Sequence, residues 1–246
     1  MNYGVRTVAV VALLALACKW GVAQIGPRYV LELPGQAGAT VGLAQGRVQL
    51  AGAGQALIRF QGLSILAVQA DSEAYSQEAA SGWPAADLLL VLPAGAGRYG
   101  GLAPLRALRG DVPVIVAEAA DAADAGVAAD LADGGPRLYP MQVWNTLELR
   151  KQTTRLRVTA MAGAPGTRGV AGFMLEVGNS RSSYRVYVSC ADDEKATLAQ
   201  RLPGADLALM PARGAPLLLA LNRGAPAKAE PAALTAAGYA FTALRR

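Results

Sequence analysis

The chain of 246 residues offers few side chains that can carry chemistry, and it contains no histidine. A Ser-His-Asp triad and a Cys-His pair both need an imidazole base, so neither can form. Cys190 lies close to Asp192 and Asp193, whose negative charge disfavours a reactive thiolate. No Ser-x-x-Lys motif occurs. We predict no catalytic residue of these classes, while paired carboxylates of the glycosidase type stay open because their pairing is spatial.

The same absence limits metal binding. A zinc site needs nitrogen or sulfur donors in a fixed tetrahedral set, and two cysteines without histidine cannot supply one. Oxygen-only Mg²⁺ or Ca²⁺ sites stay open in principle. The tight acidic cluster Asp192, Asp193 and Glu194 is interpreted as the solvated first turn of a helix. The sequence therefore predicts no bound metal and no cofactor.

A glycine motif supports one alternative function. Gly95, Gly97 and Gly100 form a G-x-G-x-x-G pattern after a strand, and Glu118 follows the next strand. Backbone amides at such a turn can hold a pyrophosphate, and the acid can hold a ribose. A dinucleotide-binding βαβ unit is thus an alternative, although a chain with 28 glycines produces such motifs by chance.

Short apolar segments between turn residues predict the elements that would position these side chains. The expected strands are 29–33, 55–60, 64–68, 87–92, 112–117, 156–160, 171–177, 184–189, 206–210 and 217–221. The expected helices are 102–108, 120–132, 193–201 and 231–237, with Pro231 at an opening position.

Several of these segments resemble the metallo-β-lactamase family in order and flanking pattern, from residue 55 to about residue 211. The strand 87–92 runs into 93–102, as the family's strand runs into His-x-His-x-Asp-His, a small-residue turn and a helix. Residues 158–166 resemble the strand and turn before the next histidine, and residues 186–192 resemble the strand that ends in Gly-Asp-Thr. The resemblance implies an α+β fold, a four-layer αββα sandwich of two β-sheets with helices outside.

The resemblance also implies that the family's metal ligands are missing. The positions of the His-x-His-x-Asp-His run fall at 94–99, which hold no His, Asp or Cys. The next histidine would fall near Pro165, and Ala191 takes the place of the bridging Asp. We interpret the chain as a metal-free, catalytically inactive protein of this fold that binds a ligand or partner. The alternative is a hydrolase of the same superfamily with a non-standard residue set.

Five side chains are candidates for the ligand pocket that the resemblance implies. Arg98, Tyr99 and Arg168 lie in loops that line the family's pocket, and Asp192 and Asp193 lie beside a third strand end. Arginine offers a fork for carboxylate or phosphate but no base. We expect the Arg98 guanidinium near the vacated metal position, paired with one of the two aspartates. The ligand is expected to be a small anion, with a protein partner as the other outcome.

The beginning of the chain predicts export. Residues 1–23 read as a signal peptide, with a small-x-small site that ends at Ala23, and residues 24–246 as a single domain in the periplasm or outside the cell. A lipoprotein anchored through Cys18 is the alternative. The apolar run is too short for a membrane span. A formal net charge of +5, without a basic helix or aromatic stripe, gives no reason to expect nucleic-acid binding.

Overall fold

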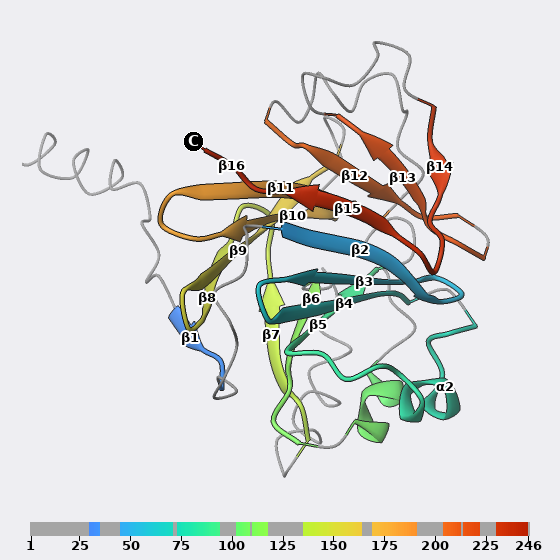
Figure 1. Ribbon diagram of the computed structural model, residues 1–246. Helices are drawn as coiled ribbons and strands as arrows, with labels where there is room; N and C mark the ends of the chain where they lie inside the picture. The colour runs from blue at the N-terminus through green and yellow to red at the C-terminus, as the bar shows by residue number, and fades with distance from the viewer. Residues whose placement is uncertain are drawn as a thin grey trace, which may run out of the picture.

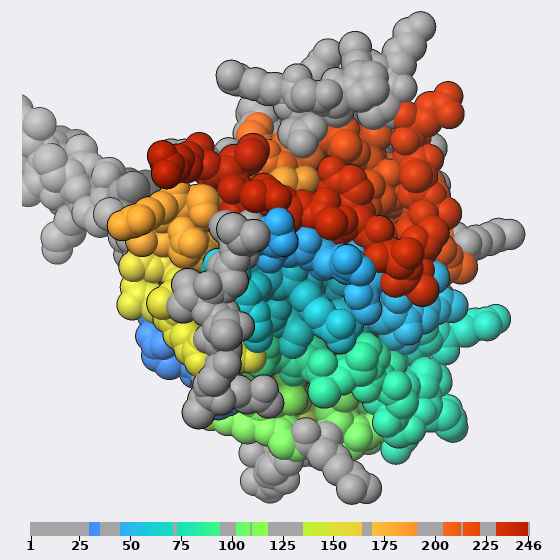
Figure 2. Space-filling view, viewed as in Figure 1, coloured from blue at the N-terminus to red at the C-terminus, as the bar shows by residue number. Residues whose placement is uncertain are grey.

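The computed structural model describes residues 30–34, 45–70, 73–93, 102–108, 110–117, 135–163, 169–190, 204–212, 214–221 and 230–245. These residues form two mixed β-sheets, here called sheet A and sheet B (Figure 1). The first strand belongs to sheet A, the next six form most of sheet B, the chain then returns to sheet A, and the last two strands join sheet B and sheet A. The C-terminal part of the chain, in red, therefore lies beside the early strand of sheet B, in blue (Figure 2).

Sheet B contains seven strands in the order β15-β2-β3-β4-β5-β6-β7. Their bounds are β2 (Gln45–Gly52), β3 (Gln55–Phe60), β4 (Leu63–Gln69), β5 (Leu88–Leu92), β6 (Pro113–Ala117), β7 (Arg137–Met141) and β15 (Tyr239–Thr242). The strands pair antiparallel from β15 to β4 and parallel from β4 to β7. Strands β5 and β6 are buried at every position, as expected of parallel strands covered on both faces.

Sheet A contains nine strands, with β16 beside β11 and the others in the order β1-β8-β9-β10-β11-β12-β13-β14. Their bounds are β1 (Val30–Glu32), β8 (Thr146–Lys151), β9 (Thr154–Ala162), β10 (Val170–Gly178), β11 (Ser182–Ser189), β12 (Leu207–Met210), β13 (Leu217–Ala220), β14 (Ala232–Ala233) and β16 (Leu244–Arg245). Strand β9 alternates buried and exposed residues over most of its length, which is typical of a strand with one face in water.

The main core lies between the two sheets. Ile58 and Leu90 of sheet B and Val158 and Phe173 of sheet A belong to one buried cluster. A second cluster covers the outer face of sheet B, where Leu89 and Val114 pack with Leu105 of the 3-10 helix η1 (Ala103–Ala107). The short helix α2 (Gln77–Ser81), capped by Ser76, packs beside η1. Sheet B is therefore the central layer of the described structure.

The expected α+β fold with four αββα layers is wrong. Two β layers are present, but the helical structure of the described residues is limited to α2 and η1. The outer face of sheet A is apolar and buried around Tyr187, Ala208 and Met210, but its other half needs no covering helix. Glu148, Arg157, Glu176 and Arg185 face one another across β8, β9, β10 and β11, and such a charged face is stable in water.

The remaining expectations about the elements had mixed outcomes. All ten predicted strands overlap observed ones, whereas β2, β7, β8 and the last three strands were missed. The predicted helix 231–237 is wrong, because residues 232–233 pair with β13 as β14. The predicted helix 102–108 is a 3-10 helix, and the predicted helices 120–132 and 193–201 lie outside the described residues.

The predicted signal peptide and Cys18 also lie outside the described residues, so export stays a prediction. Within the described part of the chain, none of the helices is long and apolar enough to cross a membrane.

Candidate functional site

The five predicted pocket residues, Arg98, Tyr99, Arg168, Asp192 and Asp193, lie outside the described residues, as do Gly95, Gly97 and Gly100. Two of the strand ends that flank them are described, and they lie close together. Leu92 at the end of β5 and Ser189 at the end of β11 line one small void of about 10 Å³, room for about one water molecule. Among the described residues, no group of three His, Cys, Asp or Glu side chains could hold a metal ion.

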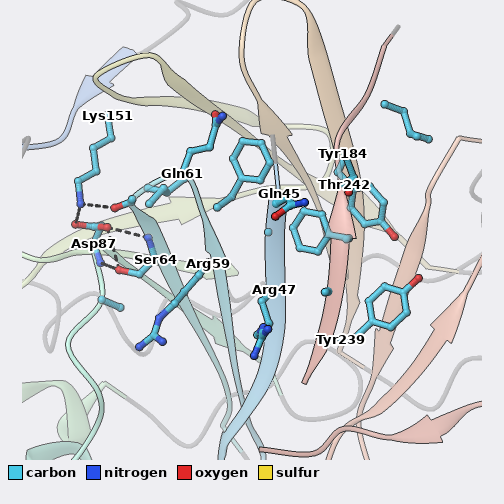
Figure 3. Close-up of a pocket in the computed structure, with 18 of the residues that line it drawn as sticks. Gln45, Arg47, Arg59, Gln61, Ser64, Asp87, Lys151, Tyr184, Tyr239 and Thr242 are labelled. Carbon is cyan, nitrogen blue, oxygen red and sulfur yellow. Dashed lines mark hydrogen bonds and ion pairs between the residues drawn. The ribbon is translucent and has the colours of Figure 1, made fainter. Parts of the chain in front are cut away.

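A much larger cavity, of about 840 Å³, lies at the opposite ends of these strands (Figure 3). It is lined by the first residues of β2 and β4, the last residues of β3, and most of β15. Its polar and charged lining side chains include Arg47, Arg59, Ser64, Asp87, Lys151, Tyr184 and Tyr239. The volume lies within the range of small-molecule sites, about 300–1,000 Å³.

Two arginines lie directly opposite each other on the cavity wall. Arg47 of β2 and Arg59 of β3 are cross-strand partners, and both side chains are exposed. The Arg47 side chain donates one hydrogen bond, from Nη1 to the Ala237 carbonyl (3.3 Å), whereas the Arg59 side chain makes no hydrogen bond or ion pair with a described residue. Like charges in directly opposed positions destabilise a sheet. The pair therefore lacks a structural explanation and provides two guanidinium groups for an anion.

The next strand carries a serine held by an acid. Ser64 lies opposite Arg59 across β3 and β4. Its backbone N–H and its hydroxyl both donate to Oδ2 of Asp87 (2.8 and 2.9 Å), and the Asp87 N–H donates back to the serine carbonyl and hydroxyl. The second oxygen of Asp87 accepts from Lys151 Nζ at 2.6 Å, with both side chains less than one-fifth exposed. Lys151 thus neutralises the acid in the cavity wall, and no other described acid pairs with Arg47 or Arg59.

Lys151 and its hairpin also fix the turn beside Arg59. The turn between β3 and β4 has two residues with positive φ, Gln61 (44°) and Gly62 (79°), as in a type I′ hairpin. Both of their carbonyls accept hydrogen bonds from sheet A, Gly62 from Lys151 (2.7 Å) and Gln61 from Thr154 (3.2 Å). This inter-sheet clamp holds the hairpin that presents Arg59.

An aromatic group forms the cavity wall on the other side of β2. The Phe241 ring stacks on Tyr184, with ring centroids 4.3 Å apart, and on Phe60, at 6.0 Å. Gly46 permits this packing, because a Cβ there would overlap the Phe241 ring. The Tyr184 side chain is buried, and its hydroxyl has no hydrogen-bond partner. Such an orphan hydroxyl costs about 1–3 kcal/mol.

The surroundings of Tyr184 keep its phenol protonated. Burial raises the pKa of the hydroxyl well above its ordinary value, and the neighbouring Tyr239 phenol and Asp206 carboxylate raise it further. Tyr239 is close enough to raise this pKa both by its charge and as a hydrogen-bond neighbour. The distance and angles of a completed hydrogen bond are nevertheless not met at the Tyr184 hydroxyl. Figure 3 shows the two hydroxyl groups directed toward each other at one side of the cavity.

The arrangement fits binding better than catalysis. Lys151 contacts Asp87 and a carbonyl oxygen, and the Ser64 hydroxyl donates to the same carboxylate. A serine nucleophile needs a base that accepts its proton, and lysine does not contact the hydroxyl here. The described cavity therefore offers cationic and hydroxyl donors without an activated nucleophile.

Sequence reasoning missed all of these residues, although part of the signal was present. Arg59 is the only charged residue in the predicted strand 55–60, and Asp87 opens another predicted strand. The strand that carries Arg47 was not predicted, so its position opposite Arg59 was not foreseen. The approach of Lys151 to Asp87 joins two sheets and needs the tertiary structure.

No protein-family model matches the sequence, and no curated protein matches it. Among solved structures, this chain is similar to the metallo-β-lactamase fold protein YhfI from Bacillus subtilis, with 12% identity and a TM-score of 0.40 over 66% of this chain and 69% of that one. It is also similar to CmlA, a diiron β-hydroxylase from Streptomyces venezuelae, with 15% identity and a TM-score of 0.39 over 65% of this chain. The match spans only 33% of the CmlA chain. YhfI has the fold that the sequence resembles.

Proposed function

We propose that this chain is an exported, metal-free binding protein without catalytic activity, and that its cavity between the β3–β4 hairpin and β15 takes a small anionic ligand. The opposed Arg47 and Arg59 carry the proposal, because they line a cavity of about 840 Å³ whose described lining holds no unpaired acid. Export rests on the signal-like residues 1–23, and the absence of metal rests on the absence of histidine.

The charges around the pair define the ligand. Asp87, the acid in the cavity wall, is already paired with Lys151. An incoming carboxylate or phosphate would relieve the repulsion between Arg47 and Arg59 and could accept paired hydrogen bonds from each guanidinium. Part of the favourable free energy of binding therefore comes from relief of the repulsion between the two arginines.

Calorimetric titration with benzoate and phenyl phosphate tests the anion site. We expect both probes to bind, and replacement of Arg47 and Arg59 together by glutamine to weaken binding at least tenfold. Arg155→Gln is the matched control, since Arg155 is also exposed on a strand and makes no ion pair with a described residue. An equal loss in Arg155→Gln, or no binding of either probe, would contradict the proposal.

Elemental analysis tests the proposed absence of metal, and intact mass tests the proposed export. We expect substoichiometric zinc and iron after mild chelation, and one tightly held ion per chain would end the metal-free interpretation. Protein from the native cell envelope should begin at Gln24. An unprocessed Met1 or a lipidated Cys18 would contradict cleavage after Ala23.

A further inference from the structure

Tyr184 combines a fixed ring with an unused donor. The side chain is 2% exposed, and its ring is held by Phe241 of β15. Tyr184 is one of the residues that line the cavity, and its hydroxyl is enclosed and makes no hydrogen bond of acceptable geometry. Buried polar groups in folded proteins are almost always paired, so an orphan hydroxyl needs an explanation. Phenylalanine would fill the same space without an unpaired oxygen, which means that folding alone does not require tyrosine here.

The nearest polar groups do not supply the missing partner. The Asp206 carboxylate accepts the backbone N–H of Arg185 at 2.8 Å and lies at the edge where β11 meets β12. Tyr239 presents a second hydroxyl from β15, close enough to act on the pKa of Tyr184. The two hydroxyls are directed toward each other but do not meet hydrogen-bond geometry (Figure 3). The raised pKa of Tyr184 keeps its proton in place, so this hydroxyl can donate at any physiological pH.

The two phenols and the two arginines line one cavity from opposite faces of sheet B. Arg47 and Arg59 lie on the outer face, whereas Tyr184 packs in the core between the sheets. Gln45 and Gly46, which begin β2, line the same cavity, and Figure 3 places Gln45 between the two groups. A molecule bound by its acidic group at the arginines can therefore extend past the start of β2 toward the phenols.

We propose that the hydroxyls of Tyr184 and Tyr239 hydrogen-bond an uncharged oxygen acceptor of the ligand, so that Tyr184 determines specificity for organic acids that carry a second acceptor group. The inference rests on the proposed function, since it concerns the same cavity. It adds a ligand class, an acid with a carbonyl-type oxygen at its far end, and a residue that selects it.

The free protein gives the first test. Because the Tyr184 hydroxyl is unpaired, Tyr184→Phe should leave the Tm of the unliganded protein unchanged or raise it. Tyr187→Phe is the matched control, because the Tyr187 hydroxyl of the same strand donates to the Ala171 carbonyl (3.3 Å). That control should lower Tm by about 2–4 °C. A comparable fall in Tyr184→Phe would show that the hydroxyl is paired in the free protein, and it would overturn the inference.

Binding of two matched acids gives the second test. The probes are 4-acetylbenzoate and 4-ethylbenzoate, which share a carboxylate and differ in one ketone oxygen. The wild-type protein should prefer the acetyl compound by roughly tenfold, the effect of one hydrogen bond of about 1.4 kcal/mol. Tyr184→Phe should bind both acids with the affinity of the ethyl compound.

The outcomes separate the two proposals. If neither acid binds, the proposed anion site itself fails. If both acids bind with equal affinity to the wild-type protein, and Arg47 and Arg59 are needed for both, the anion site stands and the role of Tyr184 is overturned. A preference for the acetyl compound that persists in Tyr184→Phe also overturns that role.

Discussion

The two sheets of this protein differ in what their outer faces contact. Strands β5 and β6 of sheet B are buried at every residue, and Leu89 on the outer face packs with η1 as Leu90 packs in the main core. Strand β9 of sheet A buries Val158 and exposes its neighbour Arg157. Sheet B is therefore an inner layer, and this part of sheet A is a surface.

This difference shows which of the expected layers the sequence pattern predicts. An apolar run such as Leu88–Leu92 predicts a layer on both faces, whereas the alternation in Thr154–Ala162 predicts water on one face. The four-layer expectation applied the first rule to both sheets. The charges at Arg155 and Arg157 already argued against a covering layer over β9.

Alanine substitutions on neighbouring residues should give the largest effects and the clearest contrast. Leu89→Ala and Leu90→Ala should each lower the free energy of unfolding by about 2–5 kcal/mol, because both side chains are buried, one on each face. In β9, Val158→Ala should also be costly, but Arg157→Ala should cost less than about 1 kcal/mol. Urea unfolding measures all four. A small effect of Leu89→Ala would contradict the burial of the outer face of sheet B.

The clamp between the sheets should give the next largest effect. Lys151→Met leaves the mostly buried Asp87 carboxylate without its cation and the Gly62 carbonyl without its donor. We expect a loss of about 3 kcal/mol, because an uncompensated buried charge remains. Arg155→Met, an exposed residue of the adjoining strand, is the control.

A double-mutant cycle isolates the clamp's ion pair. Asp87→Leu combined with Lys151→Met should recover part of the loss from either single change, since no lone charge is then left. Additive losses would show that the pair does not couple the sheets.

Local pattern explains how far the sequence could predict this fold. The apolar strands were found because burial on two faces leaves a continuous apolar run. Strand β2 was not predicted, because Gly46 and Gly52 weaken its apolar pattern. Strand β8 was not predicted either, although buried and more exposed residues alternate along Thr146–Lys151. The alanines after Pro231 favour a helix by propensity, but pairing of β14 with β13 overrides that preference. Tertiary contacts decide such weak segments.

The candidate site was less predictable than the fold, for a physical reason. Its residues come from β2, β3, β4, β8, β11 and β15 and from the residue before β5, so their proximity depends on sheet order and register. The family resemblance predicted the ligand pocket at the loops after β5, β9 and β11, which lie at the other ends of the strands. The opposed Arg47 and Arg59 become visible only when the register of β2 against β3 is known.

Alkaline pH should reveal the buried phenol on the inner face of sheet A. The folded-state pKa of Tyr184 lies above its unfolded value of 10.0, so the folded protein holds a proton that the unfolded chain releases. Its contribution to stability is complete below pH 10 and is lost as the pH rises above it. The expected slope is about 1.4 kcal/mol per pH unit for one such group. Tyr184→Phe should reduce this slope between pH 10 and 11.5 in urea unfolding, and an unchanged slope would place the phenol in contact with solvent.

The smallest effects should have opposite signs on the two outer faces. Arg59→Glu turns the like-charged cross-strand pair with Arg47 into an attractive one, so it should stabilise the protein by about 0.2–1 kcal/mol. Arg157→Glu places a third acid between Glu148 and Glu176, its cross-strand partners, and should destabilise by a similar amount. Both effects on stability should become smaller in 1 M salt, because exposed charges are screened.

Arg59→Glu should at the same time abolish binding of benzoate, whereas Arg157→Glu should leave it unchanged. If Arg59→Glu gains stability and loses binding, the pair of Arg47 and Arg59 serves ligand binding at the expense of stability. If Arg59→Glu loses stability, the pair stabilises the fold, and its role in ligand binding is contradicted.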